Sequence, residues 1–576
     1  MKLLFRCLSR YKLPLALLIA SLIASVFLQI EKTGLVASVV NDATYFPQQD
    51  LILPELKAIG LRMLLVALGM VTASVLTGVF AGHIATGVSR DLRERLYSHI
   101  MTFSMGEMNR FSIPSVISRC TDDVSVLQSF LYQFLTGALA TPILIVGGLV
   151  SVWQEQSSMI WILALAVAVV LALFGVMVSR MMPVVRRMVT ETDALHRNTR
   201  ESLSGVQILK ALNREAWSSG RISDAAGKLR ATNERYSFIE AVILPSMYLV
   251  LNLANLLVLW VGAENVSRMT IMVGEAMAII NYLYMIVSGV ISGCIIGLQM
   301  PRMSVCLKRV QEVLSTEAAV QDPATPAPLP DTFDVAFDDV SFRYAEDGGD
   351  VVRHISFTAK QGQVTAIIGN TGCGKTTLME LIPRMYDPRE GRVTIGGTDV
   401  RDFSLETLRS MVGSVPQRAL LFSGTIRSNI ALRDPEVADE ALARAAELSQ
   451  SAEIIAGKEE GLEAPIAQGG SNVSGGQRQR LTIARALCGG PRVLLLDDSS
   501  SALDYQTDVR LRDAIRAGMA DATVIIVSQR ISSIRQADQI VVMRDGEIRG
   551  IGTHEELKAG CPAYQEILRS QMEAAQ

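Results

Sequence analysis

The residues best placed to do chemistry form a glycine-rich loop between a predicted strand and a predicted helix. The strand covers 364–368, and the loop follows the pattern Gly369-x-x-x-x-Gly374-Lys375-Thr376. Glycines let backbone N–H groups close around a phosphate, and the start of the helix adds a positive dipole. We expect Lys375 to reach the β- and γ-phosphates and the Thr376 hydroxyl to bind Mg²⁺. The candidate binding residues of the loop are Gly369, Asn370, Thr371, Gly372, Cys373, Gly374, Lys375, Thr376 and Thr377.

A second candidate element is the apolar run in RVLLLDD (492–498), which predicts a buried strand that ends in Asp497. A carboxylate at that point can hold Mg²⁺ directly or through water. Because any buried strand can end in Asp, this interpretation depends on the glycine loop upstream. Together the two elements predict a site for nucleotide phosphates and Mg²⁺.

A third element, VSGGQ (473–477), opens an amphipathic helix with Ser474, Gly475, Gly476 and Gln477. A hydroxyl and free N–H groups at a helix start can bind an anion. A simple helix N-cap explains the same residue types equally well, so the residues alone leave both interpretations open.

The elements that must position these groups lie in a chain of uneven composition. Of 576 residues, 49% are hydrophobic and 19% are charged, below the roughly 25% of ordinary soluble proteins. The net charge of −3 gives no field that attracts nucleic acid, and none is expected as a partner. The seven cysteines include no C-x-x-C pair, which argues against a zinc site or a disulfide framework. Long apolar runs fill the first half, whereas the second half has the composition of a soluble domain.

The first half predicts a membrane domain. A bilayer core needs about 20 apolar residues in helical form. Six candidate spans are centred on 13–40, 60–86, 128–153, 158–180, 239–263 and 271–300.

Basic residues set the expected orientation by the positive-inside rule. They crowd the N-terminus (Lys2, Arg6, Arg10, Lys12) and the segments 87–127 and 180–238, whereas 41–59, 154–157 and 264–270 are nearly bare. We therefore expect both termini in the cytoplasm. A cleaved signal peptide is the alternative for the first run, but the topology balances only if that run stays.

Polar and soft side chains inside the spans have two interpretations. His83, Glu240, Asn252, Asn255 and Asn281 are functional candidates, or they hydrogen-bond between helices and face water at span ends. Met277, Tyr282, Tyr284 and Met285 suit binding of apolar molecules, or they are ordinary packing. The segments 87–127 and 180–238 continue helical patterns beyond the membrane.

The ordered set of motifs resembles that of the ATP-binding cassette (ABC) exporters over nearly the whole chain. Besides the three elements above, the resemblance rests on Tyr344 in VSFRY, Gln417 in VPQ, SALD (501–504), TVIIVSQR (523–530) and the connection 108–127. It implies an all-α six-helix transmembrane domain, then an α/β P-loop nucleotide-binding domain with an antiparallel β subdomain and a helical subdomain. A Pro-rich stretch places the boundaries at 1–310, a linker at 311–333, and 334–576.

The resemblance also implies roles and partners. Tyr344 would stack on adenine, and Gln417 would lie near Mg²⁺. Ser474, Gly475 and Gly476 would contact the γ-phosphate of ATP held by an opposite cassette. Asp504 would lie at the seam, which is the interface between the two cassettes. Two cassettes then sandwich two ATP molecules, so the expected cofactors are ATP and Mg²⁺ and the expected partner is a second half-transporter.

Two positions depart from the family pattern. Asp498 stands where the usual base is Glu, and Gln529 stands at the switch position, where His is usual. Asp is shorter by one methylene, and a misplacement of about 1 Å can cost on the order of 10²-fold in rate. Gln529 can hydrogen-bond a phosphate but carries no proton. The pair resembles the degenerate-site subunit of heterodimeric bacterial multidrug ABC exporters; neutral drift with Asp498 as an adequate base is the alternative. Gln468 also stands where Glu is common.

We therefore expect an ABC-type transporter ATPase in a bacterial inner membrane, exporting small amphiphilic or drug-like molecules. Its partners would be the lipid bilayer, the small-molecule substrate and a second half-transporter, with a heterodimer preferred over a homodimer. An ATP-gated channel or regulatory ABC dimer, and a siderophore-type importer with the exporter fold, are the alternatives.

Overall fold

The chain folds into two compact units. The computed structural model describes residues 7–45, 49–156, 159–345, 348–500 and 502–573. The first unit comprises Met1–Met101 and Pro114–Thr316, and the second comprises Thr102–Ile113 and Glu317–Gln576. Lys2 and Arg6, which bear on the expected orientation, and Ser501 of the SALD motif lie outside the described residues.

The first unit is helical, and six of its helices are long and apolar enough to cross a membrane, which confirms the six predicted spans. The third candidate span of the structure, Ile113–Gln154, contains two π-helical segments, of which η2 lies within the predicted span 128–153 and η1 lies just before it. The elements are α2 (Lys12–Tyr45), α3 (Gln49–Ile100), α5 (Ile113–Ser118), η1 (Arg119–Asp123), α6 (Val124–Gln133), η2 (Phe134–Ala138), α7 (Ala140–Gln156), α8 (Ile160–Ser204), α9 (Val206–Ala211), α10 (Glu215–Ser267) and α11 (Val273–Ser315).

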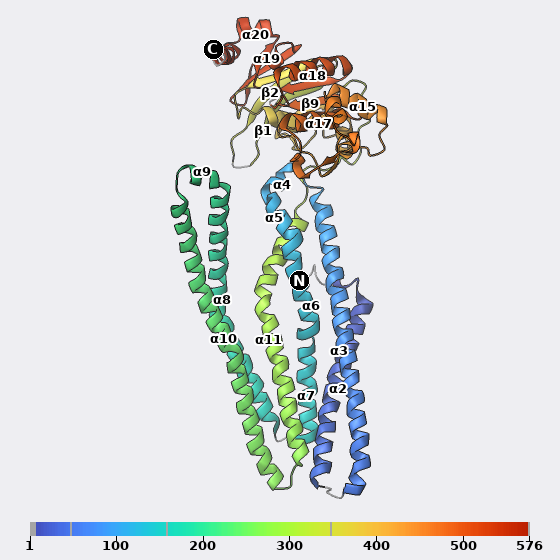
Figure 1. Ribbon diagram of the computed structural model, residues 1–576, viewed down its shortest axis with the longest axis vertical. Helices are drawn as coiled ribbons and strands as arrows, with labels where there is room; N and C mark the ends of the chain where they lie inside the picture. Colours follow the sequence, from blue (N-terminus) through green and yellow to red (C-terminus); the bar gives the residue numbers. More distant parts are fainter. Residues whose placement is uncertain (1–6, 46–48, 157–158, 346–347, 501, 574–576) are drawn as a thin grey trace. The chain divides into compact units, whose positions relative to one another are not determined.

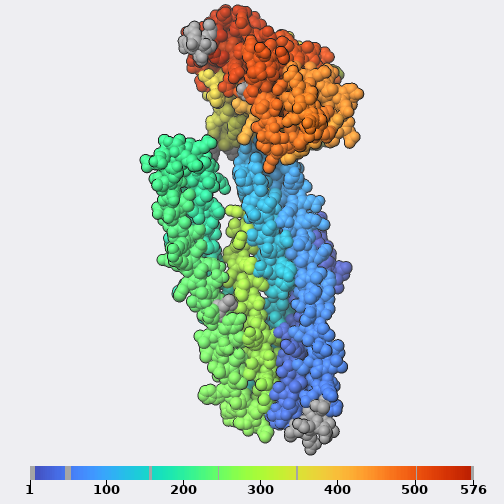
Figure 2. Space-filling model, in the orientation of Figure 1, coloured from blue at the N-terminus to red at the C-terminus, as the bar shows by residue number. Residues whose placement is uncertain are grey.

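Helices α8 and α10 extend well beyond the thickness of a bilayer. They contain 45 and 53 residues, so they are about 70 and 80 Å long, against about 30 Å for a hydrocarbon core. The two helices run side by side and are joined by the short helix α9 (Figure 1). In the space-filling view their green ends form a column that stands apart from the blue helices of the same unit (Figure 2).

Of the five polar candidates inside the spans, two form described hydrogen bonds, and both bonds stay within their own helix. Asn252 and Asn281 each donate to a carbonyl four residues earlier in their own helix, those of Tyr248 and Met277. The ring of His83 meets Tyr11 edge to face, with centroids 6.2 Å apart. Of the soft side chains near the last span, Tyr282 and Met285 are buried in the helix bundle, which favours packing for those two.

The second unit is built around two sheets. A six-stranded sheet has the order β12-β11-β3-β10-β9-β6, and all its described pairs are parallel except β11 with β12. A four-stranded antiparallel sheet has the order β2-β1-β4-β5. The bounds are β1 (Val335–Phe342), β2 (Val352–Ala359), β3 (Val364–Gly369), β4 (Glu390–Ile395), β5 (Thr398–Asp399), β6 (Val412–Val415), β9 (Val493–Asp497), β10 (Thr523–Val527), β11 (Gln539–Arg544) and β12 (Glu547–Gly552).

Helices pack around these sheets, and a helical region is inserted between β6 and β9. That region also holds the short pair β7 (Gly424–Thr425) and β8 (Pro465–Ile466). The mixed architecture confirms the predicted α/β domain with an antiparallel sheet and a helical part. The helices are α12 (Lys375–Leu381), α13 (Leu405–Met411), α14 (Ile426–Ile430), α15 (Asp439–Leu448), α16 (Ala452–Ala456), α17 (Gly475–Leu487), α18 (Tyr505–Gly518), α19 (Ile531–Ile534), α20 (His554–Gly560) and α21 (Pro562–Glu573).

A piece of the N-terminal half belongs to the second unit. Helix α4 (Met105–Phe111) begins with a capping box in which Ser104 and Glu107 exchange hydrogen bonds. Asn109 Nδ2 donates to the Tyr386 hydroxyl at 2.9 Å. The contacts therefore assign α4 to the sheet-containing unit, although more than half of the helical unit follows it in the chain.

Candidate functional site

The candidate site is assembled at one edge of the parallel sheet. Val527 of β10 is level with Ile367 of β3 on one side and with Asp497 of β9 on the other. Val415 of β6 is level with Leu496. Since parallel strands end at a common edge, the glycine loop, Asp497, Asp498, Gln417 and Gln529 all follow strand ends at that edge.

The glycine loop connects β3 to α12 and closes on its own lysine. Lys375 is buried, and its Nζ donates to the carbonyls of Gly369 and Asn370 at 2.8 Å each. Gly374 caps the helix with a φ of 97°. A Cβ there would lie 2.4 Å from Val352 Cγ1, so both backbone and space require glycine. The ammonium group of Lys375 therefore lies at the centre of the loop, with backbone groups around it.

The two predicted Mg²⁺ ligands touch each other. Thr376 Oγ1 donates to Asp497 Oδ2 at 2.8 Å. Burial raises the pKa of the Asp497 carboxyl; the hydrogen bond from Thr376 opposes this shift, and the nearby Asp498 adds to it. A hydroxyl and a carboxylate at this separation can share one hard cation, whose charge would favour the ionised carboxylate. The described residues contain no group of three or more His, Cys, Asp or Glu that would hold a metal without phosphate.

The hydroxyl of Tyr344 is hydrogen-bonded, and its ring is half exposed. The hydroxyl pairs with Thr377 Oγ1 at 2.9 Å and donates to Glu380 Oε2 at 3.3 Å. Burial raises the pKa of both the Tyr344 phenol and the Glu380 carboxyl. Thr377 is itself buried, so in this structure it supports Tyr344. Sequence reasoning missed Glu380, which lies one helical turn after Thr376 and could have been found by that spacing.

Two further candidate residues act as helix N-caps. Ser474 Oγ accepts from the Gln477 N–H at 3.2 Å, and Gln477 Oε1 accepts from the Ser474 N–H at 3.1 Å. Asp504 accepts from the Thr507 N–H at 2.9 Å, and this bond lowers the pKa of its carboxyl. The N-cap interpretation of Ser474 is therefore correct, and Ser474 is also exposed.

The glycines of VSGGQ pack beside the SALD motif itself. A Cβ on Gly476 would lie 3.1 Å from the Ala502 carbonyl, and one on Gly475 would lie 4.0 Å from Ala502 Cβ. Small residues therefore let the start of α17 approach residues 502–503 closely.

Two of the residues that depart from the family pattern, Asp498 and Gln529, follow the ends of β9 and β10, whereas Gln468 lies in the inserted helical region. Asp498 has a φ of 46°, a left-handed conformation that Asp tolerates better than most residues, and its N–H donates to the Val527 carbonyl. Gln529 and Gln417 are both exposed. The side chains of Asp498, Gln529 and Gln417 thus stand at the sheet edge where the glycine loop begins.

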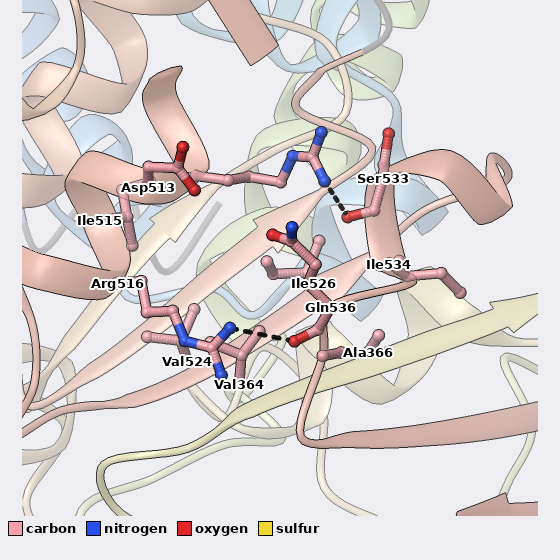
Figure 3. A pocket seen from close by; sticks show the side chains of 12 residues that line it. Val364, Ala366, Asp513, Ile515, Arg516, Val524, Ile526, Ser533, Ile534 and Gln536 are labelled. Carbon is pink, nitrogen blue, oxygen red and sulfur yellow. Dashed lines mark hydrogen bonds between the residues drawn. The ribbon is translucent and has the colours of Figure 1, made fainter. Parts of the chain in front are cut away.

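Two cavities flank the sheet. One, of about 250 Å³, is polar and is lined by Asn370 and Thr371 of the loop, by Gln529, and by Gln571 of α21. The other, of about 40 Å³, lies between α18 and the sheet, where Arg512 and Arg516 donate to the carbonyls of Ser533 and Gln536 (Figure 3). The second has room for a few waters and not for a nucleotide.

Comparisons with known proteins agree with this geometry. Residues 14–290 match the family described as "ABC transporter transmembrane region", and residues 352–501 match the family described as "ABC transporter". An uncharacterized ABC transporter ATP-binding protein of Mycobacterium tuberculosis is 36% identical over 519 residues, covering 88% of this chain and 89% of that protein.

Two other similar proteins bear on function and fold. A probable multidrug resistance ABC transporter ATP-binding/permease protein of Bacillus subtilis is 32% identical, covering 82% of this chain and 81% of that protein. A solved structure of a bacterial Atm1-family ABC exporter with ATP bound is 23% identical, with a TM-score of 0.85 and 98% of each chain covered, which shows the same fold.

Substituting Gly374 with Ala should abolish closure of the loop. The added Cβ meets Val352, and φ lies in the left-handed region, so we expect nucleotide affinity to fall at least about tenfold. Equilibrium binding of a fluorescent ATP analogue checks this. Gly349→Ala is the matched control, because a Cβ there meets nothing within 4 Å. Wild-type affinity in Gly374→Ala would contradict the closed-loop geometry.

Proposed function

Because this chain belongs to the ABC transporter family of ATP-driven transporters, we propose that it is one half of a dimeric exporter of small, amphiphilic or drug-like molecules in a bacterial cytoplasmic membrane. The observation that carries the proposal is the pairing of six membrane-length helices in one unit with the Thr376–Asp497 pair beside the glycine loop in the other. The multidrug-type relative supports the substrate class.

Different residues of the second unit would bind different parts of the ATP molecule. The loop N–H groups and Lys375 would bind the β- and γ-phosphates, and the exposed ring of Tyr344 would stack on adenine. Thr376 and Asp497, with Gln417 at the same edge, would hold Mg²⁺. When bound, that ion would neutralise phosphate charge.

A second copy of the architecture is needed for two physical reasons. First, the exposed Ser474 at the start of α17 offers a hydroxyl and helix N–H groups, which suit the γ-phosphate of ATP on another chain. Second, the tip where α8, α9 and α10 meet exposes large apolar side chains that monomeric proteins normally cover. These are Leu203, Val206, Ile208, Leu212 and Trp217.

The two departures at the sheet edge favour an unequal dimer. Asp498 and Gln529 keep groups that can bind phosphate and lack the longer carboxylate and the imidazole that support hydrolysis. This chain's own site would therefore hold ATP firmly and hydrolyse it slowly, while its Ser474 completes the partner's competent site. The heterodimer is preferred, and a homodimer with Asp498 as the base is the alternative.

Transport would follow from a two-state cycle. ATP binding brings two second units together, and hydrolysis at the competent site separates them. Both termini would face the cytoplasm, since the basic residues near the N-terminus and in the segments 87–127 and 180–238 favour that side of the membrane.

Purification from native cells in mild detergent, with mass spectrometry of the copurifying chains, tests the heterodimer. We expect a second half-transporter in equal amount, with Glu and His at the positions equivalent to Asp498 and Gln529. Recovery of this chain alone would show a symmetric dimer and would exclude the unequal arrangement.

The double substitution Asp498→Glu with Gln529→His should raise ATP hydrolysis at this chain's site. A carboxylate extended by about 1 Å and a protonatable side chain restore the missing groups, so a gain of roughly tenfold or more is expected. Steady-state ATPase rates of the intact dimer measure it. Asp498→Asn with Gln529→His is the control, because Asn tolerates the same left-handed backbone as Asp and cannot act as a base. An unchanged rate in the first variant would reject the degenerate-site interpretation.

Ser474→Ala should strongly reduce ATPase activity of the assembly, although this chain's own loop is intact. The substitution removes a hydroxyl aimed at the partner's γ-phosphate and weakens the cap of α17 by about 1 kcal/mol. Ser404→Ala, the same substitution at the N-cap of α13, controls for loss of a cap. The comparison uses the ATPase rate of the assembly and nucleotide labelling of the partner chain. Full activity of Ser474→Ala would show that sites are not shared between chains.

A further inference from the structure

The backbone that carries Gln529 is held by a side chain near the C-terminal end of the described residues. Gln571, on α21, donates from Nε2 to the Gln529 carbonyl at 2.5 Å. Its Oε1 accepts from the Ile531 N–H at 2.9 Å. One amide therefore bonds the chain on both sides of residue 530 and fixes the path of the switch segment.

Helix α21, which carries Gln571, is itself fixed by contacts to its neighbours. Tyr564 is fully buried, and its hydroxyl pairs with His554 Nδ1 at 2.7 Å. Glu566 pairs with Arg544, the last residue of β11, at 2.7 Å. Because β11 lies beside β3 in the sheet, α21 is tied to the strand that leads into the glycine loop.

The opposite side of the segment is also anchored, but further along the chain. Arg512 of α18 donates to the carbonyl of Ser533 at 2.8 Å. Ser528 Oγ accepts from the Arg530 N–H at 3.0 Å. Ser528 and Gln571 thus bind the N–H and the carbonyl of the same Gln529–Arg530 peptide group, and of these two only Gln571 does so from outside the segment.

The held segment faces the phosphate-binding loop. Gln529 and Gln571 line the same polar cavity as Gly369, Asn370 and Thr371. A donor at Gln529 contributes most to binding when its position is set before the ligand arrives, since ordering a loop on binding costs affinity.

We propose that Gln571 is a positioning residue that fixes the switch segment, so that the Gln529 amide meets the γ-phosphate of ATP. The inference rests on the proposed assignment of Gln529 to the switch position. It makes γ-phosphate recognition depend on the C-terminal helix, which the nucleotide-binding motifs do not include.

The test replaces Gln571 with Met, which has similar length and no hydrogen-bonding amide. Gln565→Met is the matched control: Gln565 lies on the same helix, is also half-buried, and donates to the Lys558 carbonyl. The full-length transporter, purified with its copurifying chains, is photolabelled with 8-azido-ATP, and labelling of this chain is displaced by ATPγS or by ADP. Gln529→Ala is measured in parallel.

We expect Gln571→Met and Gln529→Ala to weaken ATPγS binding about three- to tenfold relative to ADP, and Gln565→Met to match the wild type. If Gln529→Ala leaves the ATPγS-to-ADP ratio unchanged, the switch assignment itself is wrong. If Gln529→Ala lowers the ratio and Gln571→Met does not, the positioning role alone is wrong. An equal loss in Gln565→Met would assign the effect to general packing of α21 and overturn the proposal.

Hydrogen exchange gives a second readout that is independent of nucleotide. The Ile531 amide should be protected in the wild type and should exchange faster in Gln571→Met, but not in Gln565→Met. An Ile531 amide that exchanges freely in the wild type would overturn the proposal without any variant.

Discussion

Parallel pairing of β9 and β10 beside β3 is the interaction on which the candidate site depends. Residues as far apart in the chain as Gly369, Asp497 and Gln529 meet because their strands end level at one sheet edge. A slip of one residue in the β9–β10 register would turn Asp497 to the other face of the sheet and separate it from Thr376. The buried apolar strands therefore do more than form a core, since their register sets the geometry of the Thr376–Asp497 pair.

Locally encoded features could be predicted from the sequence. The glycine loop needs left-handed backbone at Gly374, and only a narrow choice of residues allows it. Six apolar runs of membrane length likewise dictate six helices, whatever their neighbours. The sequence alone could not show whether Ser474 caps a helix or binds an anion, because both roles use the same hydroxyl and the same backbone N–H groups. The structure confirms the cap and exposes the helix start.

Features that depend on contacts between distant segments could not be predicted. Nothing in the residues around Gln571 marks it, because its two partners lie forty residues or more upstream. The hydroxyl of Tyr344 bonds Thr377 and Glu380, so a residue assigned from the motif to adenine also packs against α12 along its length. Such dual roles arise because one side chain offers a ring to one neighbour and a hydroxyl to another.

The membership of Thr102–Ile113 in the second unit has a consequence for synthesis of the chain. This segment leaves the ribosome roughly 280 residues before Tyr386 does, so at about 5–20 residues per second it waits on the order of 14–55 s for that partner. During that interval α4 relies on its own capping box for local structure. A fragment beginning at Glu317 would lack this piece permanently and would expose the surface that Asn109 covers.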